Sequence, residues 1–110
     1  MREFNWRTKE NQRLIEAVLA LRNADETKRF LRDLMTKKEI KEFANRLEAA
    51  SLLASYMQYN FIIEKTGLSS KTIARIAKWL KGSLGGYRLI LSRINHHGNH
   101  SKLRKGLSLT

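Results

Sequence analysis

The chain has 110 residues with no proline, no cysteine and only six glycines, and 42% of its residues are hydrophobic. This length suits one domain with a modest core. The lack of proline favours helix almost throughout, and the lack of cysteine excludes disulfides and thiolate metal sites. The charged first ten residues are unlike a signal peptide, and no apolar run approaches the roughly 18 residues of a membrane span. We therefore expect an all-α, cytoplasmic protein with no membrane partner.

The net charge of +12 is unevenly distributed along the chain. Residues 65–110 hold 10 Lys and Arg and no acidic residue, whereas residues 1–64 hold 12 basic and 10 acidic residues. Such a field attracts a polyanion, most readily nucleic acid and next an anionic membrane surface. The alternative is a basic tail that is only solvated.

Two helices are predicted in the first third of the chain. Apolar residues recur at three- and four-residue steps within residues 9–22, which predicts a helix there. Asn23 with Glu26 forms a variant capping box for a second, shorter helix over residues 24–34. The apolar side chains expected to face inward are Leu14, Ile15, Val18, Leu19, Leu21, Phe30, Leu31 and Leu34.

A third helix begins after Thr36, because Thr36 and Glu39 form a full capping box. Its predicted inner face consists of Ile40, Phe43, Ala44, Leu47, Ala50 (or Ser51) and Ala54. Such a long apolar face in a small domain either packs in an ordinary helical-bundle core or is shared between two chains. The sequence leaves both possibilities open.

Three further helices are expected in the basic half of the chain. The first covers residues 59–66 and ends at Gly67, and the second covers residues 69–81, where Gly82 can take a left-handed conformation. The third covers residues 87–94. In terms of domains, we expect a flexible N-terminus over residues 1–8, one helical domain over residues 9–94 and a flexible basic tail over residues 95–110.

The segment around Gly67 has the features of a helix-turn-helix. Glycine permits the positive φ that a tight turn requires, Leu68 can fill the junction, and Ser69 can cap the next helix. The apolar contacts that such a unit needs fall at Ile62, Leu68, Ile73 and Ile76.

The opposite face of the second helix of this unit is expected to bind DNA in the major groove. Residues predicted to contact bases are Ser70, Lys71, Thr72, Ala74 and Arg75. Residues predicted to contact phosphates are Lys65, Ser69, Lys78 and Lys81. We expect a sequence-specific regulator of transcription, most simply a repressor that occludes a promoter. The alternative is a nonspecific nucleoid-associated or RNA-binding protein that uses charge alone.

The chain resembles the Trp-repressor superfamily, in its YerC/YecD-type branch. The resemblance is carried by residues 14–40, 64–80 and 85–91, and spans about residues 11–93. It implies an all-helical Trp-repressor-like fold and an intertwined homodimer, whose two recognition helices enter successive major grooves of double-stranded DNA.

The resemblance also implies an effector pocket. Thr36, Arg46 and Arg75 fall at positions that hold the corepressor L-tryptophan in the repressor proper. However, Trp79 stands where that family has a pocket serine, and Ile76 where it has a glycine. We therefore expect no L-tryptophan corepressor: either Trp79 fills the pocket, or another small effector binds there.

No other group of residues indicates chemistry. His96, His97 and His100 lie close together, but without a neighbouring cysteine or carboxylate we expect an idle tail and no metal site. Neither paired catalytic carboxylates nor a nucleophile with a base is convincing, and the glycines of residues 82–86 do not follow a strand. We expect no enzymatic activity and no cofactor.

Overall fold

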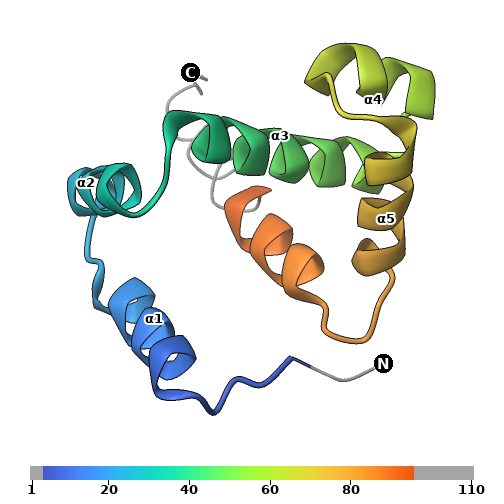
Figure 1. Ribbon diagram of the computed structural model, residues 1–110. Coiled ribbons are helices and arrows are strands. Elements are labelled where there is room, and N and C mark those ends of the chain that lie inside the picture. Colours follow the sequence, from blue (N-terminus) through green and yellow to red (C-terminus); the bar gives the residue numbers. More distant parts are fainter. Residues whose placement is uncertain (1–3, 96–110) are drawn as a thin grey trace, which may run out of the picture. The chain divides into compact units, whose positions relative to one another are not determined.

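The computed structural model describes residues 4–95, and every regular element among them is a helix. In chain order these are α1 (Lys9–Ala20), α2 (Ala24–Leu34), α3 (Lys37–Ala54), α4 (Tyr59–Thr66) and α5 (Ser70–Leu80), followed by a helix over residues 86–95 (Figure 1). The all-α prediction is confirmed. Contacts divide the chain into two units, one up to Ile40 and one from Lys41 onward. The predicted tail from residue 96 on lies outside the described residues.

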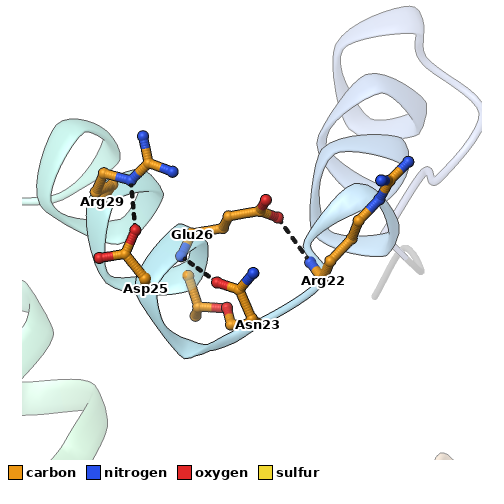
Figure 2. Close-up of polar contacts among 6 residues, drawn as sticks. Arg22, Asn23, Asp25, Glu26 and Arg29 are labelled. Atoms are coloured by element: carbon orange, nitrogen blue, oxygen red, sulfur yellow. Dashed lines mark hydrogen bonds and ion pairs between the residues drawn. The ribbon is translucent and has the colours of Figure 1, made fainter.

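The junction between α1 and α2 shows why α1 ends before residue 22, where the sequence placed its end. The Asn23 side chain accepts from the Glu26 backbone N–H at 2.9 Å, as the predicted cap requires. The Glu26 carboxylate in turn accepts from the Arg22 backbone N–H at 2.9 Å (Figure 2). Because that N–H serves the cap of α2, it is not available to continue α1, which ends at Ala20.

The predicted capping box at the start of α3 is present. Thr36 Oγ1 accepts from the Glu39 backbone N–H at 3.1 Å, and a Glu39 carboxylate oxygen accepts from the Thr36 backbone N–H at 2.9 Å. Two of the backbone donors that a helix start leaves unpaired are satisfied in this way. The local sequence thus fixes where α3 begins.

Neither α1 nor α2 buries a residue within the single chain. The apolar stripe of α1 is largely exposed, reaching 78% for Leu19, and Leu34 of α2 is 52% exposed. Phe30 and Leu31 are half-buried. The predicted inward faces of these helices therefore exist as stripes, and among the described residues of the first unit they stay largely exposed.

The hydrophobic core lies in the second unit, where helices α3, α4, α5 and 86–95 meet (Figure 1). Each contributes at least one side chain to a buried cluster, which consists of Ala49, Ala50, Ile62, Ile73, Ile76 and Leu91. Each of the larger aliphatic side chains in such a cluster stabilises the fold by roughly 1.5–3 kcal/mol when it is buried. The cluster holds α4 and α5 together behind the turn at Gly67.

Two details of the predicted elements are wrong. The predicted Ala50 of α3 is buried in the core, but beside it lies Ala49, which was not predicted, whereas Phe43, Ala44 and Ala54 of the predicted face are exposed. Small alanines allow the neighbouring helices to approach α3 closely.

The other error is at the end of α5. Gly82 does not take the left-handed conformation; the two described glycines with positive φ are Gly67 at 74° and Gly85 at 69°. Lys81 ends α5 with right-handed backbone angles instead.

Candidate nucleic-acid interface

The turn between α4 and α5 is built around Gly67. Its φ of 74° lies in the left-handed region, and its N–H donates to the Ile63 carbonyl at 2.8 Å. The buried Thr66 hydroxyl donates to the Ile62 carbonyl at 2.7 Å and accepts from the Leu68 N–H at 3.2 Å. These bonds satisfy the backbone groups that the tight turn removes from the helix ladder. Two helices follow each other at a steep angle, as a helix-turn-helix requires (Figure 1).

Ser69 caps the start of α5. Its Oγ accepts from the Thr72 backbone N–H at 3.1 Å and donates to the Thr72 hydroxyl at 3.0 Å. Both hydroxyls are therefore already engaged with each other, so a base or phosphate contact by either must compete with the cap. Thr72 is also half-buried.

The two faces of α5 separate as the sequence predicts. Ile73 and Ile76 are fully buried, and Ala77 and Leu80 are half-buried beside them. The opposite face is exposed and comprises Ser70, Lys71, Ala74, Arg75 and Lys78. Lys65, Ser69 and Lys81, the other residues predicted to contact phosphate, are exposed as well. Within residues 41–95, the fold thus leaves the predicted contact residues other than Thr72 exposed.

This surface is strongly basic. The described residues after Glu64 include seven cationic side chains and no acidic one: Lys65, Lys71, Arg75, Lys78, Lys81, Arg88 and Arg93. Within residues 4–95 the ion pairs are Arg29–Asp25 and Arg46–Glu42, so none of these seven is neutralised by a carboxylate. Cations without a carboxylate partner attract phosphate groups, and five of the seven (Lys65, Lys71, Arg75, Lys78 and Lys81) are predicted contact residues.

Of the predicted effector-pocket residues, the structure brings Arg75 and Trp79 together. The Arg75 guanidinium carbon lies 6.0 Å from the centre of the Trp79 ring, within the range of a cation–π contact. Trp79 remains 48% exposed and lines an apolar cavity of about 620 Å³. Thr36 belongs to the first unit, where its hydroxyl serves the cap of α3.

Arg46 has local partners on its own helix. It pairs with Glu42 at 2.7 Å, and its guanidinium lies 5.6 Å from the centre of the Phe43 ring. Its Nε is buried and has no hydrogen-bond partner among residues 4–95. Burial raises the pKa of the Tyr87 phenol, and the positive charge of Arg46 partly offsets that rise. Arg46 and Tyr87 therefore share one electrostatic environment beside the cavity, to whose lining Tyr87 contributes.

One residue of this region was not predicted from the sequence. Arg88, on the helix after the glycine-rich turn, donates hydrogen bonds to the carbonyls of Leu80 and Gly82 at the end of α5. An arginine six to eight residues beyond a helix end gives no pattern that distinguishes such a contact from a solvated side chain.

Other classes of site find no support in the described part of the chain. Residues 4–95 contain no group of three His, Cys, Asp or Glu side chains that could hold a metal ion. The histidines at positions 96, 97 and 100 lie outside the described residues. No helix within residues 4–95 has both the length and the apolar character needed to span a membrane.

Comparisons with known proteins agree with this geometry. The family model of the Trp repressor protein matches residues 9–95. The YerC protein of Bacillus subtilis (strain 168) is 36% identical over 88 residues, which is 80% of this chain and 85% of YerC. The crystal structure of a TrpR-like protein from Eubacterium eligens ATCC 27750 gives a TM-score of 0.77 at 33% identity, covering 82% of this chain and 93% of its own. The crystal structure of a putative Trp repressor from Staphylococcus aureus gives a TM-score of 0.75 at 32% identity. The match covers 81% of this chain and 89% of that one. The chain belongs to the Trp repressor family of DNA-binding regulators.

Proposed function

We propose that the protein is a sequence-specific, dimeric repressor of transcription that inserts α5 into the major groove of double-stranded DNA. The observation that carries this proposal is the division of α5 into two faces. Ile73 and Ile76 are fully buried, while Lys71, Arg75 and Lys78 are exposed. A helix that is fixed along one side and cationic along the other suits the groove in shape and in charge.

The roles within this face follow from position and chemistry. Lys71 and Arg75 lie one turn apart in the N-terminal half and the middle of α5, the part of a recognition helix that meets base edges, and both can donate to guanine. Ser70 and Ala74 lie beside them on the same exposed face, and both are small enough to allow close approach. Lys65, Lys78 and Lys81 lie before and after this patch, where they contact phosphates and fix the register. Ser69 and Thr72 contribute mainly through the cap that they share.

The homodimer is part of the proposal. In the single chain, apolar stripes on two separate helices remain open to solvent: Leu14, Ile15, Val18 and Leu19 on α1, and Leu89, Ile90 and Ile94 on helix 86–95. A monomeric domain of this size rarely exposes so much apolar surface. A second copy covers these stripes and places two recognition helices on one DNA site.

We further propose that L-tryptophan is not the corepressor. The indole of Trp79 already lies against the Arg75 guanidinium, at 6.0 Å from the ring centre. A free indole that used the same guanidinium face would have to displace it. DNA binding therefore does not depend on L-tryptophan, and a protein of this kind acts in the cytoplasm, at the nucleoid.

The alternative function is nonspecific binding of DNA or RNA through charge. A charge-only binder that makes roughly 6–10 phosphate contacts loses about 10³–10⁵ in affinity between 50 and 200 mM salt and prefers no site. The exposed cations of the second unit would serve that function equally well. The preference for one sequence is therefore what distinguishes the two.

The decisive experiment is selection of bound sites from a random duplex pool, followed by affinity measurements on the selected and on unselected duplexes. We expect one near-palindromic sequence, bound equally with and without added L-tryptophan. Lys71→Ala and Arg75→Ala should each reduce the preference for the selected duplex, by about 1–3 kcal/mol, because each removes a donor to base edges. Lys78→Ala should weaken binding to all duplexes alike. It should also reduce the slope of log affinity against log salt concentration by about one, because one phosphate contact is lost.

The control is Lys28→Ala, which removes an exposed cation from α2, outside the predicted contact surface. It should leave the preference between duplexes unchanged. If the selection enriches no sequence, the proposal of a sequence-specific regulator is rejected in favour of charge-only binding. Equal loss on every duplex for Lys71→Ala, Arg75→Ala and Lys78→Ala would reject the assigned roles on α5.

A further inference from the structure

The side chain of Arg88 joins the end of α5 to the helix that follows it. Its Nη1 donates to the Leu80 carbonyl at 2.6 Å and to the Gly82 carbonyl at 2.8 Å. The nitrogen carries two hydrogens, so each bond uses one of them. Arg88 lies on helix 86–95, whereas both acceptors belong to the end of α5 and the turn after it.

These bonds add to the hydrogen bonding at the C-terminal end of α5. A helix leaves its last four carbonyls without partners inside the helix, and that end carries a partial negative charge. Two carbonyls near this end are satisfied by backbone: Ala77 accepts from the Lys81 N–H and Trp79 from the Gly82 N–H. Arg88 supplies the partner for the Leu80 carbonyl, and its positive charge suits the negative end of the helix.

The turn between the two helices leaves room for this guanidinium. Gly85 has a φ of 69°, and a Cβ added there would lie 2.8 Å from Arg88 Nη2. A Cβ added to the adjacent Gly86 would meet nothing within 4 Å. Gly85 is thus needed both for its backbone angle and for the space that Arg88 occupies, whereas Gly86 is needed for neither.

The contact ties α5 to a helix that is itself fixed in the core. Leu91 of helix 86–95 belongs to the same buried cluster as Ile73 and Ile76. Those two isoleucines hold the inner side of α5 near its middle, and Arg88 holds its C-terminal end. With two points fixed along its length, α5 has a defined direction relative to the rest of the second unit.

We propose that Arg88 is a positioning residue for DNA recognition, which holds α5 at the angle that its outward side chains require in the groove. This inference rests on the proposed function. Base contacts tolerate little displacement, because hydrogen bonds weaken steeply once their distance and angle depart from the optimum. Loss of the contact should therefore reduce affinity for the selected site more than the loss of one positive charge does.

The test compares Arg88→Met with Arg93→Met. Both variants remove one arginine from the same helix, and Arg93 makes no side-chain hydrogen bond or ion pair to the described residues. We expect both to weaken binding to an unselected duplex equally. On the selected duplex, Arg88→Met should lose about tenfold more affinity than Arg93→Met, the size of one misplaced base contact. Arg88→Lys should recover most of this loss, since an ammonium can donate to both carbonyls.

A second arm tests the fit of Arg88 to the turn. Gly85→Ala should weaken binding to the selected duplex more than Gly86→Ala does. Part of that loss should disappear when Gly85→Ala is made in the Arg88→Met protein, where no guanidinium meets the new Cβ. Strictly additive losses would overturn the inference, as would equal affinities of Arg88→Met and Arg93→Met for the selected duplex.

A third measurement needs neither variants nor DNA. In the wild-type protein, the guanidinium hydrogens of Arg88 should exchange with solvent more slowly than those of Arg93, as followed by NMR. Equal exchange would reject the contact itself, even if a variant fails to fold. A wild-type protein that prefers no duplex would instead reject the proposed function, so the two failures are distinguishable.

Discussion

Gly67 has a backbone conformation that other residues adopt only at a cost. Its φ is 74°, and a Cβ built there would meet nothing within 4 Å. Glycine is therefore needed at this position for its backbone conformation and not for lack of space. The surroundings have room for a Cβ, but residues other than glycine rarely adopt this φ. For an L-residue the left-handed region costs about 1–2 kcal/mol.

Gly67→Ala should lower the free energy of unfolding by about 1–2 kcal/mol. Urea denaturation measures this as a lower midpoint with an unchanged slope. Gly86→Ala is the matched control, because that glycine lacks a positive φ and has free space around it. If both variants proved equally stable, the turn would not require the conformation that the structure gives it.

Tyr87 makes the stability of the fold sensitive to alkaline pH. Burial raises the pKa of its phenol, with Arg46 partly offsetting the rise. A group whose pKa is raised in the folded state contributes its full stabilisation below the pKa of the unfolded state, near 10 for tyrosine. That contribution is lost as the pH rises through the higher pKa of the folded state.

Tyr87→Phe should therefore reduce the fall in stability between about pH 9 and 11, the range in which tyrosine ionises. Urea denaturation at both pH values measures the difference, and Tyr56→Phe serves as control, because Tyr56 is 94% exposed. An identical fall in the wild type and in Tyr87→Phe would show that Tyr87 does not ionise differently in the folded and unfolded states.

At the scale of elements, the two helices of the helix-turn-helix begin in different ways. The start of α5 is capped by the Ser69 side chain, which accepts from the Thr72 N–H at 3.1 Å. The start of α4 has Gln58 at the equivalent position, where its side chain makes no capping bond. Because α5 has the better cap, its N-terminal turn, which carries Ser70 and Lys71, is held more firmly than that of α4.

Ser69→Ala should destabilise the protein by about 1 kcal/mol, the usual cost of removing a helix cap. Gln58→Ala should change stability little, since it removes no such bond. Thermal unfolding of the two variants beside the wild type gives the comparison. Equal effects would mean that the hydroxyl of Ser69 does not act as a cap in solution.

At the scale of the whole molecule, the chain combines a small core with extensive exposed apolar surface. Six residues form the buried cluster of the second unit, while α1 and α2 bury none. Seven cations without a carboxylate partner lie in the described chain after Glu64. The proposed association of two copies through apolar surface, with the cationic surface left for DNA, would account for both features.

Sedimentation should accordingly give twice the mass of one chain. Val18→Glu places a charge in the apolar stripe of α1 and should weaken self-association by roughly 10- to 100-fold, from the loss of about 1.5–3 kcal/mol of apolar burial. Gln12→Glu, an exposed polar position of the same helix, should have no such effect. A wild type that sediments as a single chain at all concentrations would reject the dimer.

The sequence by itself determined most of the local structure. It predicted α2 and α4 with their observed bounds, the caps at Asn23 and Thr36, and the turn at Gly67. It also predicted the burial of Ile73 and Ile76. These features depend on residues a few positions apart, whose spacing and hydrogen-bonding capacity are written directly in the sequence.

Only the tertiary structure decided which surfaces meet. It placed Ala49 in the core and left Phe43 exposed, and it directed Arg88 onto the end of α5. The predicted DNA-contacting residues of α5, apart from the half-buried Thr72, are exposed because the core faces the other side of this helix. Such outcomes depend on how helices far apart in the chain pack, since packing selects one of several possible faces of each helix.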